Sequence, residues 1–456
     1  MNAAERRSLE AQIAVGLASF LTPFLYGALS VAMPTIGRAF SFSAREMAMV
    51  MMVHLLFSTS CMLPVGRASD FIGRKGLFMA GSVLFSVSSL TAGLADSAGV
   101  LLFARALQGV GDALTFGVSG AILVTIVPPE RTGRAIGFNL TFIFAGLALG
   151  PLAGGALTSW LSWRVIFYLS AAAGVAAFAL IFRSYQEVRP QRSQTVGYAD
   201  AALFIPAMLG LILGLSVQPS LWGAALSAAA GMLLWRFVKF QEGHANPMVD
   251  VGYIRRNPAF ALANVASVLG YAAAFSTSFL LSLFLQSVQG MPPHDAGYLL
   301  LVQPTVQALA SPLAGRLSDM AHPARVSAAG LVVLGAGLLM LTGNGSDTTT
   351  LWMIGVQVVL GLGFSLFVSP NFNAIMSSVD PAHKGMASGF MSTMRGMGMC
   401  LSLSVTGLLL ALVLGEAHTG QTGPEALPAL KACFIIFGLS ALAAAAVSWR
   451  AARQTR

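Results

Sequence analysis

Long apolar runs recur along the whole chain, and short polar segments separate them. A helix that crosses a bilayer needs about 20 consecutive apolar residues, and these runs are of that length. Only 9% of the residues are charged, whereas a soluble protein carries about 25%. Because so few charges cannot cover a surface that faces water, the sequence predicts an all-α polytopic membrane protein that is embedded in a lipid bilayer.

Reading the apolar runs against the residues that break helices predicts fourteen transmembrane helices. The predicted spans are 11–33, 45–65, 76–95, 99–126, 134–159, 164–183, 198–217, 221–239, 258–287, 296–315, 325–343, 350–375, 385–413 and 430–449. They divide the chain into an N-terminal six-helix bundle (1–183), a linker with two extra transmembrane helices (184–257) and a C-terminal six-helix bundle (258–456).

The basic residues predict how the chain is oriented. The formal net charge is +9, which on its own would also fit a protein that binds nucleic acid. With the N-terminus inside, however, 20 of the 26 Lys and Arg fall on the cytoplasmic side, four fall outside, and two, Arg105 and Arg395, lie within spans. Basic residues concentrate in the cytoplasmic loops of polytopic proteins. We therefore expect a multi-pass protein with both termini in the cytoplasm and no nucleic-acid partner.

The two predicted bundles share a pattern of glycines. A shift of 252 residues superposes Gly109 on Gly361, Gly111 on Gly363, Gly133 on Gly385, Gly137 on Gly389 and Gly146 on Gly398. Two related bundles with a substrate site between them, near the bilayer midplane, are typical of secondary transporters. The repeat therefore predicts two pseudo-symmetric bundles with a central substrate cavity.

Residues 66–75 form a charged island between two apolar runs. Gly66, Asp70, Gly73, Arg74 and Lys75 match G-x-x-x-D-x-x-G-R-K, which resembles the cytoplasmic loop between helices 2 and 3 of major facilitator superfamily transporters. The resemblance implies that this loop braces helices at the cytoplasmic face and acts as a conformational gate. A partial echo in the second half begins at Gly315 and ends at Asp319.

The fifth span carries a ladder of small residues. It comprises Gly137, Gly146, Gly150, Pro151, Gly154 and Gly155, and it is similar to the helix-5 signature of antiporters in the same superfamily. Small residues let helices approach closely in lipid, and a proline tends to kink a helix, so ordinary packing is the alternative. With its two extra central helices, the chain resembles the fourteen-helix drug:proton antiporter branch. That resemblance implies a monomer in a prokaryotic plasma (inner) membrane, driven by the proton gradient without a cofactor.

The fourth span carries a polar stripe. Its members recur at spacings of three and four residues, which places them on one helix face: Arg105, Gln108, Asp112, Thr115 and Ser119. We expect this face to line a water-filled cavity. Asp112 lies at mid-span, where an ionisable group is costly and is a functional candidate by default. Arg105 matches the family's helix-4 signature, in which the arginine is implicated in proton transfer.

The chain departs from the antiporter branch in helix 1. That branch usually carries an aspartate about nine residues before a proline, but counting back from Pro34 reaches Leu25, next to Tyr26. We therefore hypothesise that Asp112 replaces the missing carboxylate as the proton-coupling group. His54, at mid-span in helix 2, could join a proton relay, since histidine titrates near neutral pH. Structural roles for both residues remain open alternatives.

Further polar residues lie within predicted spans, where they are candidates for the substrate cavity. With Gln108, Thr115 and Ser119, the candidates are Tyr26, Asn139, Gln303, Gln307, Asn371 and Arg395. An intramembrane arginine such as Arg395 should face protein, water or an anion.

Several function classes lack their motifs. The sequence contains no HExxH, no GxxxxGK[ST] and no convincing Ser-His-Asp set, which argues against a metal site, an ATP-driven pump and an enzyme. The leading hypothesis is a proton-coupled secondary transporter that works by alternating access and exports amphipathic drugs or toxic organic compounds. A transporter of one specific metabolite or organic anion, and a non-transporting membrane sensor, remain open alternatives.

Overall fold

The computed structural model describes residues 3–128, 131–187, 198–244, 247–380, 383–414 and 424–454. Helices account for nearly all of these residues, and every element is a helix. Within these described ranges, thirteen helical segments are long and apolar enough to cross a membrane. The predicted all-α membrane fold is therefore confirmed.

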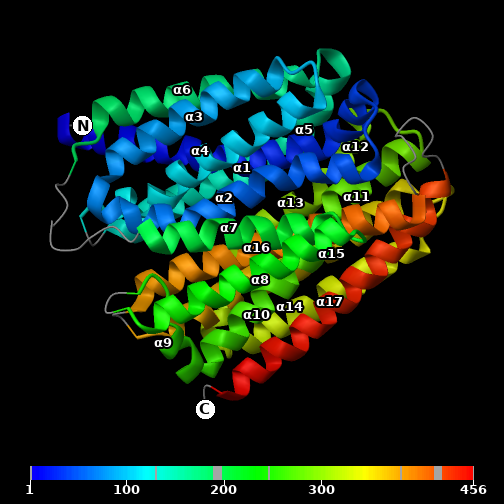
Figure 1. Ribbon diagram of the computed structural model, residues 1–456. Helices are drawn as coiled ribbons and strands as arrows, with labels where there is room; N and C mark the ends of the chain where they lie inside the picture. Colours follow the sequence, from blue (N-terminus) through cyan, green and yellow to red (C-terminus); the bar gives the residue numbers. More distant parts are fainter. Residues whose placement is uncertain are drawn as a thin grey trace.

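The first six helices form one bundle (Figure 1). They are α1 (Ala3–Phe40), α2 (Ala44–Ile72), α3 (Arg74–Gly93), α4 (Ala98–Thr125), α5 (Thr132–Trp160) and α6 (Arg164–Ser184). Their ends follow local sequence signals. Ser43 and Glu46 form a capping box at the start of α2, and the Ser97 side chain accepts a hydrogen bond from the Val100 backbone at the start of α4. Such caps satisfy backbone donors that a helix leaves free.

A pair of helices, α7 (Tyr198–Ser216) and α8 (Leu221–Glu242), lies at the junction of the two bundles in Figure 1. The Ser216 hydroxyl on α7 lies 2.8 Å from the Ser404 hydroxyl and 3.1 Å from the Met52 sulfur, so α7 touches both halves. On α8, Trp222 is 85% exposed, as expected of a helix that faces lipid. The short helix α9 (Val251–Arg256) connects this pair to the second bundle.

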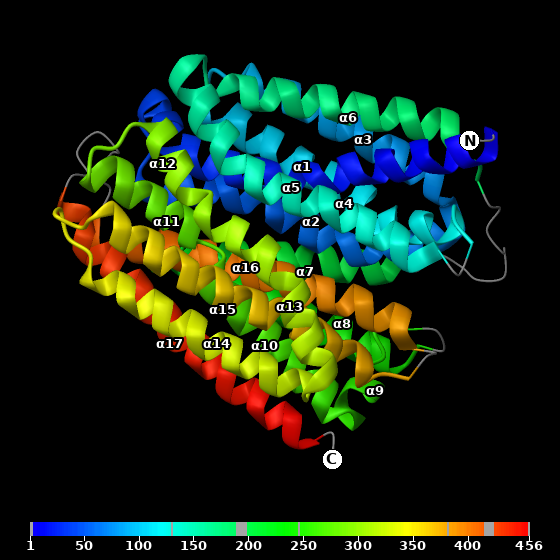
Figure 2. The same cartoon turned by 180° about the vertical axis from the view of Figure 1, so that it is seen from behind.

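The second bundle comprises the remaining helices (Figure 2). They are α10 (Pro258–Ala274), α11 (Thr277–Leu283), a π-helical turn (Phe284–Val288), α12 (Pro293–Leu300), α13 (Val302–Met320), α14 (Pro323–Met340), α15 (Thr350–Ser377), α16 (Lys384–Leu414) and α17 (Leu427–Gln454). Short 3₁₀ turns at Leu341–Gly343 and Pro424–Ala426 complete the described elements.

The predicted span 296–315 differs from the other thirteen. It corresponds to α12 and α13, which are separated at Leu301. The second of these helices carries Gln303, Gln307 and Arg316, and it is not among the helices apolar enough to cross a membrane by composition alone. The count of fourteen therefore stays a prediction.

The charged island at 66–75 is not the ten-residue loop that its composition predicts. Helix α2 continues to Ile72 and α3 begins at Arg74, so Gly73 alone connects them. Gly73 has φ 103°, a backbone conformation that glycine adopts without the steric cost that a side chain brings. A single residue of this geometry is enough to reverse the chain between two antiparallel helices.

The internal repeat is visible in how the helices pack. A side chain at Gly109 on α4 would collide with the backbone oxygen of His54 on α2, and one at Gly361 on α15 would crowd that of Gln303 on α13. Gly111 likewise faces α3, and Gly363 faces α14. Corresponding glycines thus permit the same close helix contacts in both bundles.

Candidate functional site

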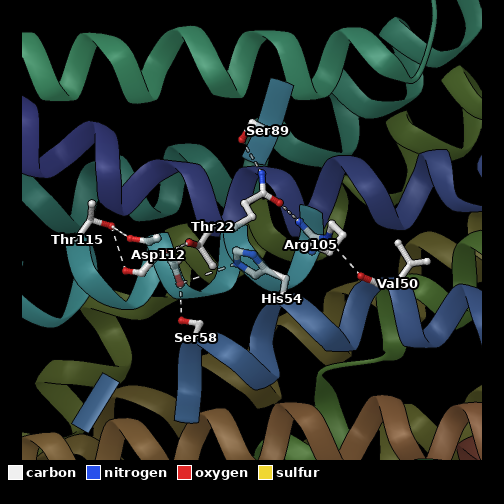
Figure 3. A network of polar contacts seen from close by, with 10 residues as sticks. Thr22, Val50, His54, Ser58, Ser89, Arg105, Asp112 and Thr115 are labelled. Carbon is white, nitrogen blue, oxygen red and sulfur yellow. Dashed lines mark hydrogen bonds and ion pairs between the residues drawn. The ribbon is translucent and has the colours of Figure 1, made fainter. Parts of the chain in front are cut away.

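Asp112 lies inside the first bundle, where three helices meet (Figure 3). The hydroxyl of Thr22, on α1, donates a hydrogen bond to Asp112 Oδ1, and that of Ser58, on α2, donates to Oδ2 at 2.6 Å. The Asp112 side chain is only 5% exposed. Each carboxylate oxygen thus has a hydroxyl partner, which is the condition for burying such a group at tolerable cost.

His54 faces the same carboxylate. Its Nε2 atom lies 3.9 Å from Asp112 Oδ2, and its side chain is 3% exposed. Neither ring nitrogen has a hydrogen-bond partner among the described residues. The structure thus brings together His54 and Asp112, as a proton relay requires, without a direct hydrogen bond between them.

Arg105 belongs to a neighbouring network on the same helix. Its guanidinium donates to Gln108 Oε1, and its Nε donates to the Val50 backbone oxygen at 3.2 Å. Gln108 in turn donates to the Ser89 hydroxyl on α3 at 2.7 Å. Arg105 therefore does not form an ion pair with Asp112, in keeping with their separation of about 10 Å along the helix axis at 1.5 Å per residue.

The polar stripe of α4 does not line an open cavity, contrary to our expectation. All five members are buried, because the face packs against α1, α2 and α3. The hydroxyls of Thr115 and Ser119 bond to carbonyl oxygens of their own helix. A small cavity reaches the stripe at Asp112 and Thr115. Hydroxyls that can satisfy themselves within the helix need no water, which is why the stripe tolerates a packed environment.

The other cavity candidates are dispersed. The Tyr26 hydroxyl donates to the Phe275 backbone oxygen at 2.5 Å, and the two rings lie 4.0 Å apart, so Tyr26 joins the two bundles. Asn139 lies on α5, Gln303 and Gln307 are buried on α13, and Asn371 is buried on α15. These four form no hydrogen bond with one another in the described part of the chain, so the structure does not assemble them into one cluster.

Arg395 is half-buried on α16. Its guanidinium lies beside the Tyr271 hydroxyl of α10. Arg395 is therefore a cavity candidate of the second bundle on a helix that packs against α2 of the first bundle.

The gate residues are organised by Glu187, which follows α6. Its carboxylate accepts hydrogen bonds from the backbone nitrogens of Arg74, at 3.0 Å, and Lys75, at 2.7 Å. The Lys75 ammonium donates to the Phe182 backbone oxygen on α6 at 2.9 Å. A negative side chain at a helix start is favoured by the helix dipole. These hydrogen bonds tie the start of α3 to the end of α6.

Other predicted gate residues differ in their surroundings. A side chain at Gly66 would make an ordinary contact with the Gly117 backbone oxygen, and one at Gly315 with the Ser369 hydroxyl, so neither glycine is required by close packing. Asp319 is exposed. The side chain of Asp70 lies outside the described part of the structure, so its role in the brace stays a prediction.

The glycine ladder joins α5 to its neighbours. Side chains at Gly146, Gly150 and Gly154 would collide with the backbone of α1, while one at Gly155 would collide with the Pro293 backbone oxygen of α12. Gly137 has nothing within 4 Å of its side-chain position. These glycines therefore let α5 pack against α1. Pro151, which lies between Gly150 and Gly154, is beside the second bundle, because its backbone oxygen approaches Gly297.

Sequence reasoning missed Thr22, Ser58, Ser89 and Glu187. The first three are hydroxyl residues within apolar runs, where Ser and Thr usually bond to their own helix. Their importance follows from the neighbours that the fold gives them. Glu187 was detectable only as an acid shortly after the sixth span.

The repeat shows that the charged site belongs to one half. The glycine shift of α4 onto α15 places Gln357 where Arg105 lies and Phe364 where Asp112 lies. The offset between Gly66 and Gly315 places Gln303 where His54 lies. The second bundle thus repeats the packing of the first without its ionisable residues.

Comparison with known proteins identifies the family. The model of the Major Facilitator Superfamily matches residues 15–403 and 263–456. The multidrug resistance protein Stp of Mycobacterium tuberculosis (strain ATCC 25618 / H37Rv) is 30% identical over 433 residues, covering 92% of this chain and 80% of Stp. The drug efflux pump JefA of the same strain is 26% identical, covering 91% of this chain and 82% of JefA.

The chain is also similar to a further transporter sequence and to a solved structure. The riboflavin transporter RibZ of Clostridioides difficile (strain 630) is 25% identical, covering 82% of each chain. The solved structure of a bacterial homologue of the human drug peptide transporters PepT1 and PepT2 shares the fold, with a TM-score of 0.70 at 17% identity over 98% of this chain and 99% of that one. The chain is therefore a multi-pass membrane transporter that belongs to the Major Facilitator Superfamily.

Proposed function

We propose that the protein is a proton-coupled secondary transporter that exports amphipathic drugs or toxic organic compounds by alternating access. It acts as a monomer in a prokaryotic plasma membrane, exchanges protons for its small-molecule substrate and needs no cofactor. The similarity to Stp, a multidrug resistance protein, and to JefA, a drug efflux pump, supports this substrate class.

The observation that carries the proposal is the environment of Asp112. It is the only carboxylate in the middle of a described membrane-spanning helix. Its partners Thr22 and Ser58 are hydroxyls, which can donate to a carboxylate and can equally accept from a carboxylic acid. Such a pocket holds Asp112 in either protonation state, as a group that carries a proton through a transport cycle must be held.

Contacts between the bundles support alternating access. At one end of the molecule, Gln286 donates to the Val31 backbone oxygen at 2.8 Å, and the His294 backbone nitrogen donates to the Ser159 hydroxyl at 3.1 Å. Both contacts join the first bundle to the second. Along α5, by contrast, the half that begins at Thr132 is largely exposed, with Ile136 at 44%. The molecule is thus closed at the α12 end, as one state of an alternating-access cycle would be.

The orientation follows from the basic residues. Figure 1 shows the N-terminus, the C-terminus and α9, which carries Arg255 and Arg256, at the end of the molecule opposite α12. Arg74 and Lys75 start α3 near the Glu187 carboxylate that follows α6. By the positive-inside rule this end faces the cytoplasm. In this orientation, the contacts at the α12 end would close the outward side of the protein.

A transporter of one specific metabolite is the second candidate, because the riboflavin transporter RibZ is also similar to this chain. Membrane vesicles from an efflux-deficient bacterial host, with empty-vector vesicles as the control, separate the two. We expect an imposed pH gradient to drive transport of several unrelated amphipathic dyes, and we expect nigericin, which collapses the gradient, to stop it. Transport of riboflavin alone would favour the second candidate, and dye transport that ignores nigericin would contradict proton coupling.

A further inference from the structure

The helix α16 presents four sides, and three of them are occupied. Gly389 and Gly396 face Leu63 and Thr59 of α2, and Gly398 faces Val268 and Tyr271 of α10. Ser404 contacts Ser216 of α7. At about 100° per residue, Arg395 falls on the remaining side, opposite α7. Since α7 lies on the outside of the junction in Figure 1, Arg395 is directed into the region between the bundles.

Arg395 has no carboxylate partner there. No Asp or Glu of the described ranges lies within ion-pair distance of its guanidinium, and its neighbour is the Tyr271 hydroxyl. A guanidinium within the membrane is costly unless it meets an anion, water or backbone carbonyls. The half-buried side chain of Arg395 thus supplies a positive charge that the protein itself does not neutralise.

The mid-span carboxylate of the first bundle is already engaged by hydroxyl groups. Asp112 directs both carboxylate oxygens at the hydroxyls of Thr22 and Ser58. In α1, the Tyr26 hydroxyl donates to the Phe275 backbone oxygen. A cationic compound between the bundles would therefore find an arginine and no unengaged carboxylate among the described mid-span residues.

The tyrosine beside Arg395 belongs to a cluster of aromatic rings. The Tyr271 ring packs edge-on against Phe364 and Phe367, with centroids 5.6 Å and 5.5 Å away. Phe275, one helical turn after Tyr271, contacts Tyr26 at the closed end. A site with a guanidinium beside aromatic surface suits a compound that is apolar at one end and negatively charged at the other.

We propose that Arg395 binds the acidic group of the transported compound, so that the preferred substrates are amphipathic organic acids. This inference rests on the proposed export function and narrows its substrate class. The guanidinium forms paired hydrogen bonds with a carboxylate or sulfonate, and the aromatic side chains of Tyr271 and Phe364 contact the apolar part.

Two dyes that differ by a single sulfonate test the proposal. These are 8-anilinonaphthalene-1-sulfonate, an anion, and N-phenyl-1-naphthylamine, its neutral counterpart. Binding is measured by equilibrium dialysis with the full-length protein in lipid nanodiscs, and empty nanodiscs correct for partition into lipid. The variants are Arg395→Gln and Arg395→Lys, and Arg236→Gln on the exposed face of α8 is the matched control.

We expect the wild-type protein to bind the sulfonate dye more tightly than the neutral one. Arg395→Gln should weaken sulfonate binding by about tenfold or more, as loss of a charge-assisted pair implies, while neutral-dye binding changes far less. The affinity of Arg395→Lys, which keeps the charge, for the sulfonate dye should lie between those of the wild type and Arg395→Gln. The affinity of Arg236→Gln should equal that of the wild type. Retained binding of the neutral dye shows that each variant is folded.

Three results would overturn the proposal. In the first, Arg395→Gln weakens the binding of both dyes equally. In the second, Arg395→Gln leaves the binding of the sulfonate dye intact. In the third, the wild-type protein binds the cation ethidium more tightly than the sulfonate dye. Transport of ethidium and the neutral dye under a pH gradient, without sulfonate binding, would refute this inference and leave the proposed export function standing. Sulfonate binding at Arg395 without any pH-driven transport would refute the export function instead.

Discussion

The Nε2 atom of His54 lies 3.9 Å from the Oδ2 atom of Asp112, with no hydrogen bond between them. The carboxylate already has Thr22 and Ser58 as partners, so His54 is not needed to hold it. The internal repeat aligns His54 with Gln303 of the second bundle. We expect the substitution His54→Gln to lower pH-driven transport by about three- to tenfold without abolishing it. Complete loss in a folded variant would show instead that His54 is an obligatory proton carrier.

The glycine ladder predicts a contrast between two substitutions of the same kind. A side chain at Gly154 would collide with the Ala28 backbone oxygen, whereas a side chain at Gly137 would meet nothing within 4 Å. Overpacking costs about 1–3 kcal/mol, and alanine is favoured over glycine inside a helix by about 1 kcal/mol. Gly154→Ala should therefore lower the thermal unfolding temperature of the purified protein, and Gly137→Ala should leave it unchanged or raise it. Equal effects would contradict the assigned helix contact.

The contacts of Glu187 indicate that an acid outside the motif at residues 66–75 contributes to stability. Its carboxylate accepts from the backbone nitrogens of Arg74 and Lys75. Glutamine keeps one acceptor oxygen but loses the negative charge that the helix dipole favours, which contributes about 0.3–1 kcal/mol. Glu187→Gln should therefore lower the free energy of unfolding by that amount and make the α2–α3 connection more sensitive to proteases. Glu425→Gln, in a turn before α17, is the matched control and should behave like the wild type.

The contact between Ser159 and His294 offers a test of alternating access. The Ser159 hydroxyl lies 3.1 Å from the His294 backbone nitrogen, at the closed end of the bundles. In a background without Cys61, Cys400 and Cys433, a Ser159→Cys, His294→Cys double variant should cross-link under oxidation and stop transport. Reduction should restore transport, and either single variant should be insensitive to the oxidant. Undiminished transport in the cross-linked protein would contradict opening at this end.

The sequence predicted the helices well, because membrane length and apolar composition define them with few alternatives. The sequence-based predictions differ from the structure where charged or polar residues lie within helices. The charged residues around Gly73 suggested a loop, yet α2 and α3 are helical on both sides of that glycine. In the α12–α13 region, Gln303 and Gln307 reduce the apolar character that marks a span, and the helix is interrupted at Leu301.

The candidate site could be predicted only in part. Helical spacing placed Asp112 and Arg105 on one face, but spacing within one helix says nothing of what covers that face. Thr22 and Ser58 come from α1 and α2, and their approach to Asp112 depends on tertiary packing that the sequence does not display. For the same reason, an expected water-filled cavity proved to be a packed interface.

The central claim is that Asp112 carries the proton that drives export. Its most direct test compares two modes of dye transport by the Asp112→Asn variant in proteoliposomes, with exposed Asp347→Asn as the control. Asparagine keeps the size of the side chain and an acceptor for one hydroxyl, but it cannot titrate. We expect transport driven by a pH gradient to fall by about tenfold or more while exchange between equal dye pools at uniform pH persists. Undiminished pH-driven transport by the Asp112→Asn variant would contradict the claim.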